Sequence, residues 1–160
     1  LAKAGYDVAD VDLPPELDSI EDTFRVISNY EGKAALADDF RDHMKQMNPW
    51  MRETGESLWS DEEYAAAVAA ANTARAALAR VYEYFPVLLT PSTAGEAPAD
   101  LVSPTMSSFN RMWTLMHGPT ITLPVARGAN NMPIGIQIAA GVGDDAALIA
   151  WTAEIHRILA

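Results

Sequence analysis

The stretch from Trp113 to Gln137 constrains the fold more than any other part of this chain. It runs Trp-Thr-Leu-Met-His-Gly-Pro-Thr-Ile-Thr-Leu-Pro-Val, then a polar turn, then Met-Pro-Ile-Gly-Ile-Gln. This order predicts a helix end, a Gly-Pro break, an extended segment, a turn over residues 128–131, and a second strand that closes at Ile138. Two segments this rich in apolar residues are typical of strands inside a sheet.

The second strand alternates between two unlike faces. One face carries the isoleucines Ile134, Ile136 and Ile138, and the other carries Gly135, Gln137 and Ala139. The small face would fit beneath a helix, and this is the interpretation that the strand alone favours. It could instead leave room for a ligand that hydrogen-bonds to Gln137.

Composition narrows the class of protein. With 160 residues, 49% of them apolar, the chain can bury a core as one compact domain. Its net charge of −11, without a basic cluster, argues against nucleic acid or an anionic membrane as a partner. The absence of cysteine excludes disulfides and thiolate chemistry, and no apolar run reaches the roughly 20 residues of a membrane helix. The composition leaves the redox compartment undetermined, and we take the cytoplasm as the default location.

The N-terminal residues predict the end of a helix followed by a strand. Leu1 to Ala4 form the last turn and Gly5 ends it, after which Tyr6–Leu13 alternates as a short strand near a sheet edge. Pro14 and Pro15 close that strand. Because the chain opens within a helix, we expect it to have been cut from a longer protein.

The next segment is predicted to be mainly helical. A helix capped by Asp18 is expected to break at Gly32, to resume over Lys33–Met47, and to stop at Asn48-Pro49. A connector over Trp50–Leu58 follows. The longest helix is then predicted over Ser60–Phe85, because Ser60 and Glu63 have the spacing of a capping box.

After that helix, strands and helices alternate in the manner of an α/β protein. We expect a short buried strand over Val87–Thr90, a loop without periodicity over Thr93–Ser103, and a helix over Ser107–Met116. Beyond the two strands described above, a glycine-rich turn leads to a final helix capped by Asp144 or Asp145.

The sequence contains no complete set of catalytic residues. Ser92 follows a predicted strand but has no evident base nearby in the sequence, and the two aspartates after the glycine-rich turn disfavour phosphate binding there. Asp39 and His43 have a metal-ligand spacing, yet a solvated helix face explains them better. We therefore predict no catalytic residue, no metal and no cofactor within these residues.

Four blocks of sequence resemble, in order and spacing, the C-terminal part of amidase signature family enzymes. They are Val87-Leu88-Leu89-Thr90-Pro91-Ser92-Thr93, Phe109-Asn110-Arg111-Met112-Trp113, Gly118-Pro119 with Thr120-Ile121-Thr122-Leu123-Pro124, and Met132-Pro133-Ile134-Gly135-Ile136-Gln137-Ile138. The resemblance implies an α/β fold, as part of the mixed-sheet amidase signature fold with flanking helices. Residues 1–160 would be the C-terminal portion of a single amidase-type domain.

The same resemblance implies an activity. Enzymes of this family hydrolyse amides with a Ser, a cis-configured Ser and a Lys, and their serines lie in a Gly/Ser-rich stretch that this sequence lacks. The N-terminal catalytic portion would therefore be absent, and this chain alone would be an inactive part of an amidase for linear amides. An amidotransferase A-type subunit is one alternative, and a non-catalytic binding or scaffolding module is another.

By position in the family, the acyl pocket would be lined by residues of the helix before Gly118-Pro119, together with one amide of the last strand. These candidates are Phe109, Met112, Trp113, Met116, His117 and Gln137. Packing in the core is the competing interpretation for the helix residues, and a structural hydrogen bond is favoured for His117. The expected partners are a small-molecule amide and the missing N-terminal portion or a partner chain, with homodimer formation left open.

Overall fold

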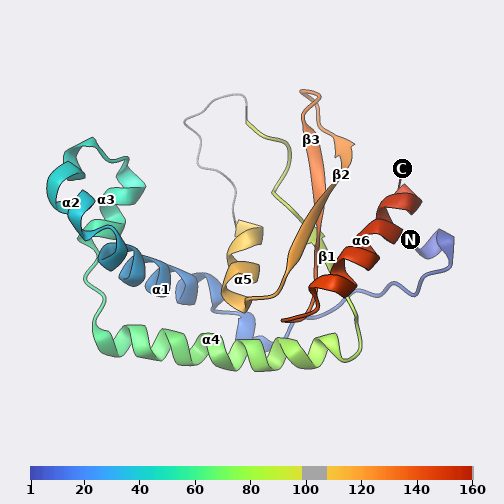
Figure 1. The fold of residues 1–160 in the computed structure, drawn as a ribbon, viewed down its shortest axis with the longest axis horizontal. Helices are drawn as coiled ribbons and strands as arrows, with labels where there is room; N and C mark the ends of the chain where they lie inside the picture. The colour runs from blue at the N-terminus through green and yellow to red at the C-terminus, as the bar shows by residue number, and fades with distance from the viewer. Residues whose placement is uncertain (99–107, 160) are drawn as a thin grey trace. The chain divides into compact units, whose positions relative to one another are not determined.

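A computed structural model describes residues 1–98 and 108–159, and these residues form two compact units. The first unit combines residues 1–15 with residues 75–160, and the second comprises residues 16–74 (Figure 1). The boundary between residues 74 and 75 falls inside the longest helix, α4, which spans Asp61–Tyr82. Part of the predicted loop Thr93–Ser103, and Ser107, lie outside the described residues.

The second unit is helical. It contains α1 (Ile20–Ala35), α2 (Ala37–His43), the 3-10 turn η3 (Met44–Gln46), α3 (Pro49–Glu56) and the first part of α4; another 3-10 turn, η2 (Pro15–Leu17), precedes α1. Buried Thr54 of α3 donates its hydroxyl to Asn29 Oδ1 of α1 at 3.2 Å. The rings of Tyr30 and Tyr64 stack with their centroids 4.2 Å apart, which joins α1 to α4.

Two predictions in this unit are wrong: the break at Gly32 and the connector over Trp50–Leu58. Gly32 does not interrupt the helix, because α1 continues to Ala35 before a short second helix begins. The helical stretch does stop before Asn48-Pro49, as predicted, with its last turn ending at Gln46, but the same dipeptide also starts a new helix. The Asn48 side chain accepts from the Met51 amide at 2.9 Å, and Pro49 occupies the first helical position. Proline suits that position because its missing N–H would have no partner there. The predicted connector Trp50–Leu58 is thus mostly α3.

The predicted start of the longest helix is confirmed. The Glu63 amide donates to Ser60 Oγ at 3.2 Å, and the Ser60 amide donates to Glu63 Oε2 at 2.8 Å. This reciprocal pair satisfies two amides that otherwise lack partners at a helix N-terminus.

The first unit is built on a three-stranded antiparallel sheet. Its strands are β1 (Leu88–Pro91), β2 (Thr120–Arg127) and β3 (Pro133–Ala139), arranged in the order β1-β3-β2. All three were predicted to within a few residues, and so were the helices α5 (Ser108–Met116) and α6 (Asp145–Leu159). The observed mixture of helices and sheet confirms the predicted α/β class.

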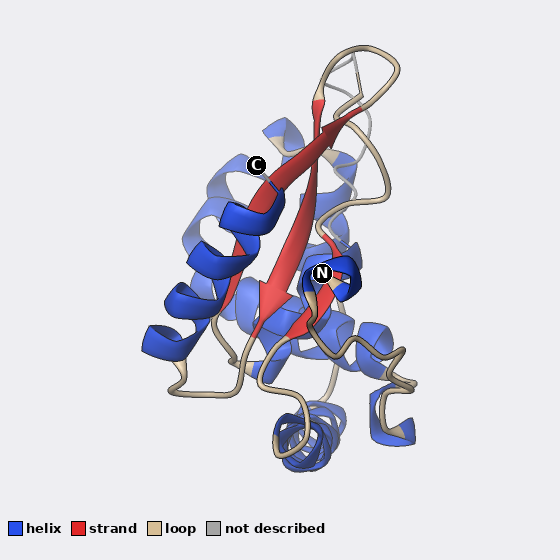
Figure 2. Ribbon diagram, turned by 90° about the vertical axis from the view of Figure 1, so that its right-hand side faces the viewer, coloured by secondary structure: helices blue, strands red, loops and turns tan. Residues whose placement is uncertain are grey.

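The isoleucine face of β3 forms the core with α6. Ile138 is 0% exposed and Leu148 of α6 is 1% exposed, and Ile155 is buried in the same cluster. Figure 2 shows α6 lying beside the strands. Burying such side chains contributes about 1.5–3 kcal/mol each, which makes this face a main source of stability for the unit.

The N-terminal segment differs from its prediction. Residues 2–4 form one 3-10 turn that ends at Gly5 in a left-handed conformation with φ 90°, as expected. Tyr6–Leu13 is not a strand, since its backbone is not paired with the three strands of the sheet, and Tyr6 contacts α6 instead. The Tyr6 hydroxyl donates to Glu154 of α6, and its ring meets Trp151 edge-on at 6.2 Å.

The second face of β3 is polar and closely filled. Ser92 and Thr122 occupy the space beside Gly135, since a Cβ on this glycine would lie 3.0 Å from Ser92 Oγ and 2.7 Å from Thr122 Cγ2. The two hydroxyls also hydrogen-bond to each other at 3.2 Å. There is thus no room for a ligand directly at Gly135.

Gln137 lies next along this face, opposite Thr90 of β1 and Thr122 of β2. It is 3% exposed, and neither its Oε1 nor the Thr90 hydroxyl has a hydrogen-bond partner within the described part of the chain. Buried polar atoms without partners are uncommon in folded proteins. This face therefore differs from the isoleucine face in burying polar atoms that lack partners among the described residues.

Candidate functional site

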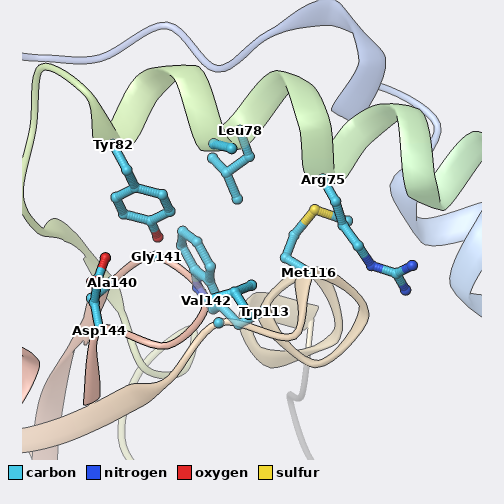
Figure 3. Close-up of a pocket in the computed structure, with 11 residues that line it drawn as sticks. Arg75, Leu78, Tyr82, Trp113, Met116, Ala140, Gly141, Val142 and Asp144 are labelled. Carbon is cyan, nitrogen blue, oxygen red and sulfur yellow. The ribbon is translucent and has the colours of Figure 1, made fainter. Parts of the chain in front are cut away.

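A cavity of about 220 Å³ lies in the first unit among the C-terminal part of α4, helix α5 and the segment that follows β3 (Figure 3). We call it the α4–α5 cavity. It is lined by Arg75, Leu78, Ala79, Tyr82, Trp113, Met116, Gly118, Ala140, Gly141, Val142 and Asp144. Three stretches far apart in the sequence thus meet around one space.

Helix periodicity explains why α4 contributes three of its larger side chains. Arg75, Leu78 and Tyr82 are three and four residues apart, a spacing that places them on one side of a helix. From α5, Trp113 and Met116 are three residues apart and equally aligned. The wall formed by Leu78, Met116 and the Trp113 ring is largely apolar.

Two hydrogen-bond donors in this wall have no acceptor in the part of the chain that the structure describes. Trp113 is 3% exposed and its Nε1–H is buried, and the Tyr82 hydroxyl is buried as well. Among the described residues neither atom finds a partner. Figure 3 shows the Tyr82 hydroxyl pointing from α4 toward the turn that holds Gly141 and Asp144, with the Trp113 ring beside it.

The electrostatic surroundings keep the Tyr82 phenol protonated. Burial is the main cause that raises the pKa of Tyr82 far above its ordinary value, and the negative charge of Asp144 raises this pKa further. Both effects disfavour a phenolate. A protonated phenol keeps its O–H, so Tyr82 can donate a hydrogen bond.

Gly141 is necessary for the close approach of these groups. A Cβ at this position would lie 2.7 Å from Asp144 Oδ2 and 3.7 Å from a Tyr82 ring carbon. A larger residue would push the carboxylate out of place. The glycine thus allows the turn after β3 to bring Asp144 up to the cavity.

Arg75 holds the C-terminal end of α5 in position. Its Nε donates to the Leu115 carbonyl at 2.8 Å, and its terminal nitrogen lies 3.0 Å from His117 Nε2. Because a guanidinium has only donors, His117 Nε2 accepts this bond. His117 adopts a left-handed conformation with φ 61°, which ends the helix before Gly118.

The structure brings together only some of the predicted site residues. Trp113 and Met116 line the α4–α5 cavity, and His117 adjoins it through Arg75. Phe109 and Met112 are half-buried on α5 and are not among the lining residues. Gln137 lies on the polar face of the sheet. The assignment of these six residues to a substrate site stays a prediction.

Sequence reasoning missed Tyr82 and Asp144 as members of this site. Tyr82 fell within a predicted helix, and its spacing from Leu78 was the one available signal. Asp144 was interpreted only as a helix cap, and its backbone carbonyl does accept the Leu148 amide at 2.8 Å at the start of α6.

Comparison with known proteins places this fold in a family. The Amidase family model matches residues 1–149, so this chain belongs to the amidase family. The AmiC proteins of Mycobacterium bovis and Mycobacterium tuberculosis are each 26% identical to it, over 98% of this chain and 37% of their own length. The chain therefore spans less than two-fifths of the length of these curated relatives.

Solved structures of the family share the fold. An amidase crystal structure superposes with a TM-score of 0.87 at 22% identity, covering 99% of this chain and 39% of that one. A 6-aminohexanoate cyclic dimer hydrolase gives 0.74 at 21% identity, covering 99% and 38%. The A-type subunit of the Thermotoga maritima glutamyl-tRNA(Gln) amidotransferase gives 0.59 at 17% identity, covering 82% and 30%. The described residues include no helix long and apolar enough to cross a membrane.

Proposed function

We propose that this chain takes part in the hydrolysis of a carbon–nitrogen amide bond. The family match over residues 1–149 is the observation that carries the proposal. The α4–α5 cavity supports it, because a small apolar space with a few buried donors is suited to binding part of a small-molecule amide.

We place the nucleophile outside these 160 residues. Ser92, the serine that follows β1, is 7% exposed and donates its hydroxyl to Thr122, with no acid or base in that contact. A serine nucleophile needs a base that takes its proton. A Ser/cis-Ser/Lys triad on a further segment, or on a partner chain, would supply the chemistry, and this chain would supply sheet core and substrate contacts.

The test is ammonia release from acetamide, benzamide and longer-chain amides. The 160-residue chain and a longer protein that contains it are assayed side by side. Activity in the longer protein and silence in the short chain are the expected results. If the short chain alone releases ammonia in proportion to its concentration and after repurification, the nucleophile lies within it, and Ser92 becomes the first residue to replace.

An amidotransferase A-type role is the second candidate, and the Thermotoga maritima relative supports it at the level of fold. The net charge of −11 weakens it, because this surface would repel a nucleic acid phosphate backbone. Ammonia release from glutamine that depends on added partner subunits would favour this role. Complete inactivity of the longer protein, together with retained ligand binding, would favour a non-catalytic module.

A further inference from the structure

We infer that the tip of the β2–β3 hairpin is a binding site for a carboxylate group, and that the side chain of Glu96 occupies this site as an internal ligand. The site consists of the backbone amides of Asn130 and Met132, the side-chain amide of Asn130 and the exposed backbone of Gly128. We call it the hairpin-tip site. The inference goes beyond the proposed function, because it concerns another part of the first unit and requires no hydrolysis.

The turn at the end of the hairpin directs two backbone donors away from its own hydrogen bonds. The Gly128 amide donates to the Met132 carbonyl at 2.9 Å, and the Asn131 amide donates to the Gly128 carbonyl at 3.0 Å. Asn131 adopts a left-handed conformation with φ 62°, which asparagine tolerates better than most residues. These two bonds do not involve the amides of Asn130 and Met132, which face Glu96 instead.

The Glu96 carboxylate accepts from both of these amides. Its Oε1 lies 2.9 Å from the Asn130 amide nitrogen and 2.8 Å from Asn130 Nδ2. Its Oε2 lies 3.1 Å from the Asn130 amide nitrogen and 3.2 Å from the Met132 amide nitrogen. These hydrogen bonds, above all the one from the Asn130 amide, hold the pKa of Glu96 below its ordinary value. The site therefore favours the charged carboxylate over the neutral acid.

Gly128 is needed for the ligand and not for the turn. Its φ is not positive, so its backbone conformation is open to other residues. A Cβ at this position, however, would lie 2.4 Å from Glu96 Cδ and 2.5 Å from Glu96 Oε2. The planar carboxylate thus lies directly against the glycine backbone. A sulfate or phosphate ion carries oxygens on all sides of its central atom, and the same backbone would crowd it.

Arg127 places a positive charge at the same turn. Its Nη1 donates to the Asn131 carbonyl at 2.8 Å. The chain as a whole carries a net charge of −11 and repels anions at long range. A guanidinium beside the turn offsets this repulsion locally, because the interaction between two charges is strongest at short distance.

The chain keeps its internal ligand close to the site. Ser92 is fixed to the sheet, since its amide donates to the Gly135 carbonyl at 3.1 Å, and Gly95 bends the following segment with a φ of 144°. A short tether of this kind gives the attached group an effective concentration of about millimolar or higher. A free carboxylate can enter the site only when Glu96 leaves it. Binding of an external carboxylate would therefore detach residues 93–96 from the hairpin.

Removal of the Glu96 side chain tests the site. Protein labelled with nitrogen-15 at methionine alone gives one backbone amide signal for each of its 7 methionines, and Met132→Leu identifies the signal of Met132. Glu96→Ala should move this proton signal upfield, because the amide loses its hydrogen bond. Sodium acetate at neutral pH should return the signal toward its parent position in a saturable way. Sodium chloride at the same ionic strength should not, and the parent should not respond to either salt.

Matched variants separate the contributions to binding. Glu83→Ala removes an exposed glutamate before β1 and should leave the Met132 signal in place. Gly128→Ala should displace Glu96 through its added methyl group, so the Met132 signal should move upfield as it does in Glu96→Ala. The double variant with both substitutions should no longer respond to acetate. The other methionine signals, at their parent positions, confirm that each variant is folded.

Three results would overturn the inference. A Met132 signal that stays in place in Glu96→Ala would show that Glu96 does not occupy the site. A signal that moves but does not respond to acetate would show that the amides bind only a tethered side chain. An equal response to acetate, chloride and sulfate would show that the site has no preference for a carboxylate. None of these results depends on ammonia release, so the proposed function is tested separately.

Discussion

The two faces of the three-stranded sheet differ in how completely their groups are satisfied. The face toward α6 is apolar and closed, with Ile138 and Leu148 fully buried. The opposite face carries hydroxyls and one amide, and both Thr90 and Gln137 bury an oxygen without a partner in the described residues. Real proteins break the rules of packing and polar satisfaction mainly where function requires it. The comparison shows that the buried apolar contacts lie on one side of the sheet and the polar atoms without partners lie on the other.

The largest expected loss of stability comes from a substitution on the apolar face. Leu148→Ala should lower the free energy of unfolding by about 2–5 kcal/mol, because it removes buried methyl groups and leaves a cavity next to Ile138. Urea unfolding followed by circular dichroism measures this change. Ile149→Ala, one residue along α6 and 61% exposed, is the control and should stay within about 0.5 kcal/mol. Similar losses in both variants would contradict the described core.

A smaller effect is expected from crowding on the polar face. Gly135→Ala should destabilise the protein by about 1–3 kcal/mol, since the added methyl would meet Thr122 Cγ2 and Ser92 Oγ. Thr122→Ser removes the nearer contact. The double variant should therefore recover part of the loss in a double-mutant cycle. Strictly additive effects would show that Thr122 does not fill the space beside Gly135.

Replacement of Gln137, whose amide oxygen has no partner among the described residues, should cost little. Gln137→Met keeps the length of the side chain and removes an oxygen that has no partner, so we expect a change within about 1 kcal/mol, of either sign. Chemical denaturation is again the measurement. A loss above about 2 kcal/mol would mean that the amide is hydrogen-bonded in solution.

The smallest effect concerns the outer side of α6, and it depends on pH. Arg157, and after it the Tyr6 hydroxyl, lower the pKa of Glu154 from 4.5 to about 2. A depressed carboxyl pKa stabilises the fold above the unfolded value, and this contribution is lost as the pH falls from about 4.5 toward 2. The melting temperature of the parent should exceed that of Glu154→Gln near neutral pH, and the gap should close in this acid range. A gap that widens on acidification would contradict the assignment.

Local signals in the sequence were enough for most of the fold. The capping box at Ser60 and the alternation after Pro133 each depend on neighbours within a few residues, and both predictions are confirmed. The stop at Asn48-Pro49 was correct, but the helix that begins there was missed, because the same dipeptide suits a helix stop and a helix start. Only the contact of Asn48 with the Met51 amide distinguishes the two.

The candidate site was less accessible from the sequence, since its members meet through tertiary packing. Tyr82 and Trp113 are far apart along the chain, and no local pattern indicates that their polar atoms are buried beside the same space. The space beside Gly135 was misjudged for the same reason. Its occupants, Ser92 and Thr122, come from outside the strand that was analysed.

The strand order has a consequence for how the protein is synthesised. Within residues 1–98 and 108–159, both β1 and β2 pair only with β3, so neither has this partner until the ribosome has released residues 133–139. At about 5–20 residues per second, β1 waits roughly 2–10 s before its edge can be covered. During that time the nascent chain exposes strand edges that chaperones or neighbouring chains can occupy. A stop codon shortly before Pro133 would leave both strands in that condition permanently.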